Sequence, residues 1–278
     1  MEEMGYEKTC VFGYKAKWER SGGSIVAENC LHSEPTWMEE MKDQIQDLQL
    51  KYMVLPGSHD SGSYTKSGKL YSLTAGSIFT QEEDFLSQLL WGIRFFDIRP
   101  GTFRAFFHED FGEETADMLY KLFPKYWVSH NSIPTHFMQT VIDQTKEFLK
   151  NTREIVIWSC IGFRNALSTF DSNWMDKGYD DEFSSFTNYL TIEFKDWLVK
   201  PEQLNWDKTV TEVLNDPTLK SGEGRIILTS DKDKTYPLNM EIWFPFIIGA
   251  YNNPQTIDDS WPFLNEQVKK SKSFYEIL

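Results

Sequence analysis

The sequence predicts an α/β protein, a (β/α) barrel of the TIM type with a short N-terminal β extension, and two observations lead to this fold class. Short apolar runs alternate with segments of helical periodicity, which is typical of a parallel sheet covered by helices. No glycine-rich phosphate loop follows any of these runs, which argues against a dinucleotide-binding sheet. Barrels of this type carry their chemistry at the carboxyl ends of the strands.

The chain is expected to begin with a β extension over residues 1–34, followed by a barrel domain over residues 35–278. Within the extension, residues 9–18 and 24–28 flank Ser21-Gly22-Gly23, which favours a hairpin with a glycine turn. The barrel domain opens with a helix predicted from Thr36 as its N-cap. Its apolar residues at helical spacing are Trp37, Met38, Met41, Ile45 and Leu48.

The apolar runs indicate six barrel strands. They cover residues 51–57, 93–99, 126–130, 154–160, 225–230 and 244–251. Helices are predicted over residues 81–92, ended by Gly92, and over residues 136–151. Since eight strands close such a barrel, we expect a barrel that is incomplete or open at its C-terminal end. The alternatives are that the chain is a fragment or that the N-terminal strands take the missing places.

A long insertion is expected at about residues 161–223, where the strand–helix alternation weakens. The acidic and aromatic segment 171–186 predicts a loop with short helices, and residues 207–216 predict a helix that stops before Pro217. An insertion of this length between strands is a candidate rim of a binding cleft.

Composition excludes several classes of function. The formal net charge of −14 and the sequence pI of about 4.8 argue against binding to a nucleic-acid backbone or a broad electrostatic hold on anionic membranes. No apolar run is long enough to span a bilayer, and the acidic N-terminus does not resemble a signal peptide. The three cysteines have no metal-type spacing, and their odd, low number does not suggest a disulfide scaffold, which favours a reducing compartment. We therefore expect a cytoplasmic protein, peripheral to a membrane if its substrate is a lipid.

The chemistry is expected at the ends of three successive strands. His59 and Asp60 follow the first, Asp97 and Arg99 end the second, and His130 ends the third. Two imidazoles can serve as general base and general acid, and a guanidinium suits a phosphate oxygen. The set suggests phosphodiester cleavage without a metal. The alternatives without a catalytic role are that both histidines are turn residues and that Asp97 and Arg99 form a structural ion pair at the strand end.

At these residues the sequence resembles the phosphatidylinositol-specific phospholipase C X-domain family, and best its stand-alone eukaryotic members. The similar stretches are LPGSHDS (55–61), GIRFFDIR (92–99) and WVSHNSIPTHFMQTVIDQTKEFLKNTREIVIW (127–158). The resemblance extends over about residues 35–265 and is strongest over 50–160.

The resemblance implies roles for the five residues. His59 is the implied base toward the inositol 2-hydroxyl, His130 the acid toward the diacylglycerol oxygen, and Arg99 the phosphate ligand. Asp97 and Asp60 orient these groups. Asp231 and Tyr251 are expected to contact substrate.

The resemblance also bears on cofactors and partners. No cofactor and no Ca²⁺ is expected, because Asp60 and Arg99 stand where calcium-dependent relatives have an asparagine and a carboxylate. The expected partner is a phosphoinositide, or a related phosphodiester lipid, at a membrane surface. The sequence gives no indication of oligomeric state.

Two departures from the family keep other functions open. Ser159-Cys160 stands at the end of the fourth strand, where the family has an inositol-binding lysine, and no residue matches the eighth-strand aspartate that pairs with the base. His59 would then lack its orienting carboxylate and turnover would be weak or absent. A catalytically inactive phosphoinositide-binding or scaffold protein is therefore one alternative. A metal-dependent glycerophosphodiesterase-type barrel is the other.

Overall fold

The computed structural model describes residues 18–20, 23–25, 33–64, 79–81, 83–102, 115, 118, 125–130, 133–161, 163–165, 179–201, 206–230 and 243–244. The chain divides into two compact units, Met1–Phe246 and Ile247–Leu278, and all the described residues belong to the first.

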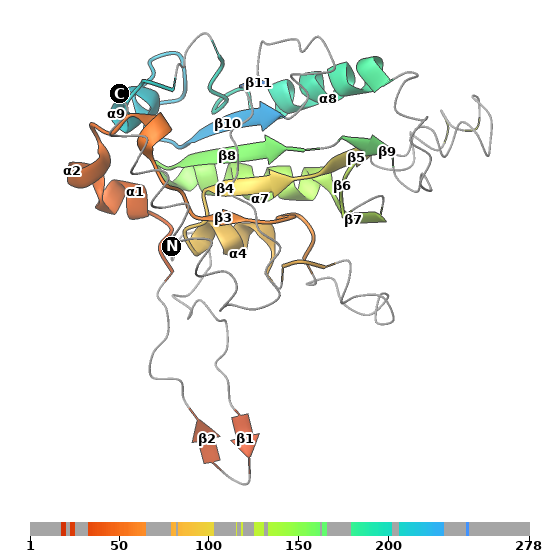
Figure 1. The fold of residues 1–278 in the computed structure, drawn as a ribbon, viewed down its shortest axis with the longest axis horizontal. Helices are drawn as coiled ribbons and strands as arrows, with labels where there is room; N and C mark the ends of the chain where they lie inside the picture. Colours follow the sequence, from red (N-terminus) through yellow and green to blue (C-terminus); the bar gives the residue numbers. More distant parts are fainter. Residues whose placement is uncertain are drawn as a thin grey trace, which may run out of the picture. The chain divides into compact units, whose positions relative to one another are not determined.

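A five-stranded parallel sheet forms the centre of this unit (Figure 1). Its strands, in the order in which they pair, are β11 (Trp243–Phe244), β10 (Arg225–Ser230), β8 (Ile155–Cys160), β4 (Phe95–Ile98) and β3 (Gly57–Ser58). Every neighbouring pair is parallel, which confirms the α/β class with a parallel sheet. Among the described residues these strands form an open sheet, so closure into a barrel stays a prediction.

A second, four-stranded sheet follows directly from β4. It has the order β7 (Ile133–Phe137), β6 (Tyr126–His130), β5 (Pro100–Thr102) and β9 (Arg164–Asn165). Because only Arg99 separates β4 from β5, the chain passes from one sheet into the other without a loop. The third predicted strand, β6, pairs antiparallel with β5, so the expectation of a third parallel strand is wrong. The register shift between Val128 and Ser129 lies in its pairing with β7.

The parallel strands bury two different faces. Phe96, Trp158 and Leu228 belong to one continuous core with the helices, and Phe85 of α4 (Phe85–Leu90) lies 4.2 Å from Phe96 between ring centroids. Helix α7 (Met138–Asn151) contributes Val141, Ile142, Phe148 and Leu149 to that core.

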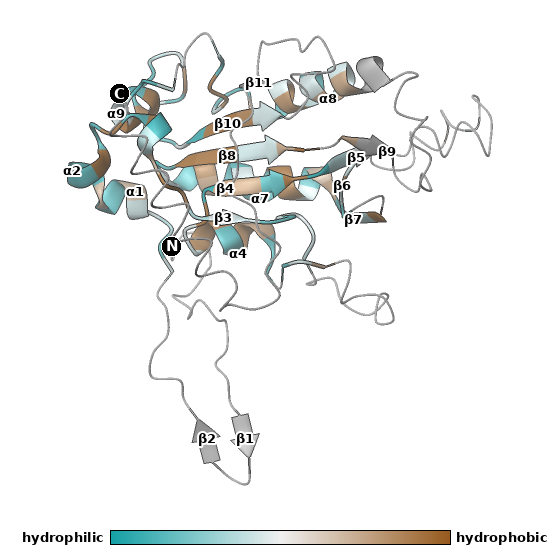
Figure 2. Ribbon diagram, in the orientation of Figure 1, coloured by the Kyte–Doolittle hydropathy of each residue, from teal (hydrophilic) through white to brown (hydrophobic). Residues whose placement is uncertain are grey.

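On the opposite face, Phe95, Ile157 and Ile227 stand in register and form an apolar layer. One step toward the carboxyl ends, Asp97, Ser159 and Thr229 stand in register and form a polar layer. Figure 2 shows this change as β8 and β10 turn from brown to white toward their arrowheads.

Helix α4 ends as the sequence predicts and begins later. Asp84 caps it by accepting a hydrogen bond from the Ser87 N–H at 2.8 Å, so the helix begins at Phe85 and not at Gln81. Gly92 follows the helix with a φ of +98°, a left-handed conformation that favours glycine.

The two segments before β4 differ from prediction. The helix expected from Thr36 is broken at Met41 into α1 (Trp37–Glu40) and α2 (Lys42–Ile45), and the Thr36 hydroxyl donates to Glu40 instead of capping. The strand expected over 51–57 is a 3-10 helix, η2 (Leu50–Tyr52), an extended segment and the two residues of β3. Val54 is 75% exposed, so this apolar run does not mark a buried strand.

The insertion contains more helix than expected. Helix α8 (Tyr179–Glu193) covers half of the segment predicted to be a loop, and its buried Phe186 and Leu190 belong to the main core. Helix α9 (Val210–Leu214) confirms the other helix of the insertion, and Thr209 and Glu212 form a capping box at its start.

The predicted N-terminal hairpin is present and short. Strands β1 (Trp18–Arg20) and β2 (Gly23–Ile25) pair antiparallel, so Gly23 belongs to a strand and not to the turn. Residues 9–17 and 26–28 of this prediction lie outside the described residues.

A buried ion pair closes the amino end of the parallel sheet. Arg94 and Glu154 are both fully buried, with 2.8 Å between Nη2 and Oε2. Glu154 also accepts the N–H groups of Met38 and Glu39, and Arg94 donates to the Pro35 carbonyl at 2.7 Å. The pair therefore connects α1 to strands β4 and β8.

No helix within the described ranges is both long and apolar enough to cross a membrane.

Candidate active site

The five predicted site residues meet in one cluster. His59 and Asp60 follow β3, Asp97 lies in β4, Arg99 lies between β4 and β5, and His130 ends β6. Although β6 is antiparallel to β5, the Ser129 N–H bonds the Arg99 carbonyl at 2.9 Å, which brings His130 to the other four. The cluster thus joins the ends of two different sheets.

Arg99 contacts three members of the cluster. Its Nε forms a close ion pair with Oδ1 of Asp60, and its Nη2 lies 3.1 Å from Oδ2 of Asp97. The same Nη2 lies 2.8 Å from Nε2 of His59. Because a guanidinium only donates, Asp97 and His59 accept hydrogen bonds from Arg99, whereas the contact with Asp60 is an ion pair.

Asp60 lies at the centre, between the two imidazoles. Its Oδ2 is 3.4 Å from Nε2 of His59 and 3.3 Å from Nε2 of His130, and its side chain is fully buried. Burial raises the pKa of the Asp60 carboxyl above its ordinary value, and the charge of Arg99 acts in the opposite direction. The residue has a φ of +44°, held in part by its N–H, which donates to Oδ2 of Asp97 at 3.1 Å.

The loop that carries His59 and Asp60 is fixed by residues that sequence reasoning did not single out. Gln81 donates to the His59 carbonyl at 2.6 Å, and the buried Gln88 of α4 donates to the Ser61 carbonyl at 2.9 Å. A buried glutamine on an apolar helix face is the signal that could have identified Gln88. Gly62 packs so closely on β6 that an added Cβ would lie 2.4 Å from Cγ1 of Val128.

The contact with Arg99 fixes the tautomer of His59. Since a guanidinium only donates, Nε2 of His59 accepts and its ring proton belongs on Nδ1. Nε2 of His130 lies 3.3 Å from Oδ2 of Asp60, and its buried Nδ1 has no hydrogen-bond partner among the described residues. Nε2 of both histidines thus lies near the same carboxylate oxygen, and Nε2 of His59 also contacts Arg99.

The acidic half of the cluster could hold a cation. His59, Asp60 and Asp97 each offer a ligand atom, all within 4.8 Å of one another. The guanidinium of Arg99 already contacts both carboxylates and the imidazole. A metal ion at this position would compete with Arg99.

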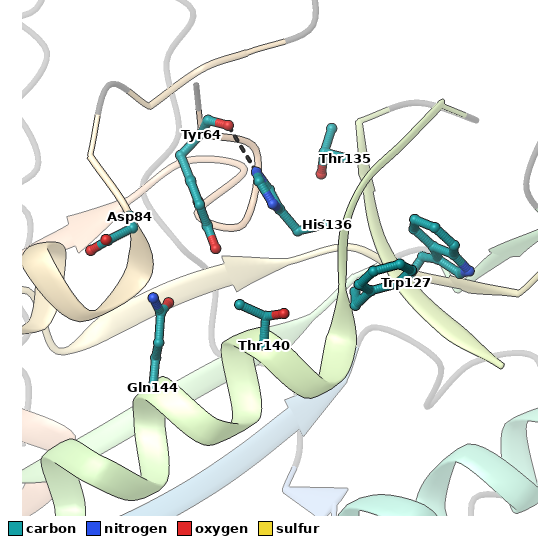
Figure 3. A pocket seen from close by; sticks show the side chains of 8 residues that line it. Tyr64, Asp84, Trp127, Thr135, His136, Thr140 and Gln144 are labelled. Carbon is teal, nitrogen blue, oxygen red and sulfur yellow. Dashed lines mark hydrogen bonds between the residues drawn. The ribbon is translucent and has the colours of Figure 1, made fainter. Parts of the chain in front are cut away.

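A separate pocket of about 400 Å³ lies beside the start of α7 (Figure 3). The His136 ring stacks on Tyr64 with 3.7 Å between centroids, and its Nε2 donates to the Tyr64 carbonyl at 2.8 Å. Burial lowers the pKa of His136 and raises that of Tyr64. None of the five cluster residues lines this pocket.

The other predicted positions have mixed outcomes. Asp231 and Tyr251 lie outside the described residues. Ser159 is buried beside Asp97 in the polar layer, and Cys160 faces the helical core. Ser159 thus lies on the same face of the sheet as Asp97, whereas Cys160 does not.

Two curated relatives, both from Staphylococcus aureus, are described as 1-phosphatidylinositol phosphodiesterase. Each is 27% identical over 216 residues, or 77% of this chain. The match covers 56% of the relative from strain Newman and 53% of that from strain NCTC 8325 / PS 47. The chain therefore spans about half the length of the curated relatives it matches. No family model matches the chain.

A solved structure has a similar fold. The phosphatidylinositol-specific phospholipase C from Listeria monocytogenes aligns with a TM-score of 0.55 at 20% identity, over 87% of this chain and 75% of that one. The likeness shows that the two chains share a fold.

Proposed function

We propose that the chain is a phosphoric diester hydrolase of the phospholipase C X-domain type that cleaves a phosphoinositide. The observation that carries the proposal is the meeting of His59, His130 and Arg99 around the buried carboxylate of Asp60. The description of the two relatives as phosphodiesterases supports the same chemistry.

In the proposed reaction, Nε2 of His59 takes the proton from the inositol 2-hydroxyl as that oxygen attacks phosphorus. The bond from phosphorus to the diacylglycerol oxygen breaks, and Nε2–H of His130 protonates this leaving oxygen. The products are diacylglycerol and a cyclic inositol phosphate. The contact with Arg99 supports the role of His59, because it requires a lone pair at Nε2.

Arg99 and the two aspartates supply charge and position. A guanidinium fixed by Asp60 and Asp97 can stabilise the negative charge that builds up on the phosphoryl oxygens. The Asp60 carboxylate lies near Nε2 of both imidazoles, and not beside Nδ1 of His59, where a carboxylate that orients the base would accept the ring proton. The expected weak turnover for want of an orienting aspartate therefore stays a prediction.

The proposed reaction needs no metal. Arg99 supplies a cation at the position where His59, Asp60 and Asp97 could otherwise hold one. The substrate would be reached at the surface of a membrane, from the cytoplasm.

The test is release of water-soluble inositol phosphate from phosphatidylinositol vesicles, with and without a chelator. We expect chelator-resistant release that His59→Ala abolishes. The control for Arg99→Ala is Arg153→Ala, because the Arg153 guanidinium is hydrogen-bonded only to the exposed Asn215 among the described residues. We expect Arg99→Ala to lose activity and Arg153→Ala to keep it. Release that the chelator abolishes would favour the metal-dependent barrel. No release by the folded chain would favour a phosphoinositide-binding or scaffold protein.

A further inference from the structure

The contact between Arg99 and His59 occupies the atom that the proposed reaction needs. Nη2 of Arg99 lies 2.8 Å from Nε2 of His59, and it is the lone pair of Nε2 that would take the substrate proton. We propose that Arg99 gates the base: it holds Nε2 of His59 in the unliganded protein and releases it when a phosphoryl group binds. The inference rests on the proposed function for the role of His59 as base.

The contact blocks the base because of what each group can do. A guanidinium has donors and no acceptor, so the hydrogen bond consumes the in-plane lone pair of Nε2. The second ring nitrogen carries the proton in this tautomer. A neutral imidazole held in this way has no nitrogen left that can accept a proton from a hydroxyl.

Phosphate binding should break this contact before the others. Arg99 makes two charged contacts, to Asp60 and Asp97, and one contact to a neutral imidazole. The carboxylates carry a full negative charge and a neutral imidazole does not, so Coulomb attraction holds the guanidinium to Asp60 and Asp97 more strongly than to His59. An anionic phosphoryl oxygen near Nη2 therefore competes most easily with His59, while the carboxylates keep the guanidinium in place.

The arrangement links binding to activation. The lone pair of His59 becomes available only when a phosphoryl group is bound beside it. The side chain of His59 is 35% exposed, so a reagent in solution can report on the state of Nε2.

The experiment measures carbethoxylation of individual histidines in the full chain by mass spectrometry after brief treatment with diethylpyrocarbonate. Inorganic phosphate is the probe, compared with chloride at equal pH and ionic strength. We expect phosphate to accelerate modification of His59 by roughly five- to tenfold, the factor that release of one hydrogen bond allows. His136, whose Nε2 is bonded to the Tyr64 carbonyl, is the internal reference and should not respond.

Arg99→Ala should make His59 fast to react without phosphate and insensitive to it. Because this variant leaves the buried Asp60 without its cation, Asp60→Asn/Arg99→Ala serves as a second variant in case the first does not fold. The gate is overturned if phosphate slows the modification of His59 in the wild-type chain or leaves its rate unchanged. It is also overturned if His59 reacts equally fast in the wild-type chain and in a folded variant.

This readout needs no turnover. If phosphate accelerates the modification of His59 in a chain that does not cleave lipid, Arg99 does release His59 but the proposed function is wrong. If phosphate slows the modification in a chain that cleaves lipid, the proposed function stands and the gate is wrong.

Discussion

At the scale of single residues, Asp60 combines features that oppose stability. Its carboxylate is fully buried, burial raises the pKa of that carboxyl, and its backbone has a positive φ. A charged group at such a position costs folding free energy unless its partners compensate fully. Functional sites often hold groups of this kind, because the placement that serves chemistry is not the one that favours folding.

Asp60→Asn should therefore stabilise the protein and abolish activity. Asparagine tolerates the left-handed conformation and carries no charge. Since the folded state raises the pKa of Asp60, the wild-type chain bears the cost of the charge above that raised pKa. The cost decreases as the pH falls through the raised pKa and is gone by about pH 4, near the ordinary value of the carboxyl. We expect a gain of about 1 kcal/mol in the free energy of unfolding at pH 7, measured by urea denaturation at pH 7 and pH 4. An unchanged or lower stability at pH 7 would contradict the prediction.

His136 should make stability depend on pH. Burial lowers its pKa in the folded chain, whereas the unfolded chain takes up a proton near pH 6.5. The unfolded state therefore binds more protons as the pH falls below about 6.5, and stability decreases. His136→Phe keeps an aromatic ring against Tyr64 and removes the titrating group. The stability difference between wild type and variant should shrink from pH 8 to pH 5, and a constant difference would show that His136 does not contribute.

At the scale of elements, the site depends on how closely the loop after β3 packs on β6. Gly62 touches Val128, the Thr135 hydroxyl of β7 lies 3.2 Å from the Gly62 carbonyl, and His136 bonds the Tyr64 carbonyl. These contacts hold the loop with His59 and Asp60 against the hairpin that ends β6 at His130. His59 and His130, the proposed base and acid, are thereby held at a fixed separation.

Gly62→Ala should disturb this fit. The new methyl group would lie 2.4 Å from Cγ1 of Val128, so one of the two elements must move. We expect a loss of about 1–3 kcal/mol in stability and a large loss of inositol phosphate release. Val128→Ala in the same chain removes the clashing methyl groups, so a double-mutant cycle should show that the two changes are not additive. Additive losses would mean that the clash is not the cause.

Strands and helices were predictable where the spacing of apolar residues along the chain matched the burial of their side chains. Strands β8 and β10 are unbroken apolar runs and α7 has clear helical spacing, and all three appear within two residues of the prediction. The strand predicted around Val54 failed because the Val54 side chain is 75% exposed. The direction of β6 failed because alternation of residue types does not encode whether a strand runs parallel. The five cluster residues were found from chemistry, whereas Gln81 and Gln88 act through backbone carbonyls that no motif marks.

At the scale of the whole molecule, the Arg94–Glu154 pair connects elements far apart in sequence. Beyond α1, β4 and β8, Arg94 also donates to the Leu89 carbonyl of α4 at 2.9 Å. It lies at the amino end of the sheet, and the proposed site lies at the carboxyl end. The two charged clusters therefore lie at opposite ends of the sheet.

Removing one member of this ion pair should lower the free energy of unfolding by more than the intact pair contributes to it. Arg94→Met leaves the Glu154 carboxylate buried without its cation, and we expect a loss of about 3–5 kcal/mol. Arg94→Met/Glu154→Met removes both charges and should lose less than the sum of the single variants, as measured by chemical denaturation. If the stability losses of the two single variants add up to the loss of the double variant, the two residues act independently.

The pairing of β4 with β8 has a consequence for synthesis on the ribosome. All five reacting groups lie between His59 and His130, whereas the strand that holds β4 in place begins at Ile155. The groups therefore emerge from the ribosome before the strand that fixes Asp97 beside Ser159. A partly translated chain would contain all five residues of the proposed site and lack the strand that aligns them. The nascent protein should therefore not cleave lipid until the later strands join the sheet.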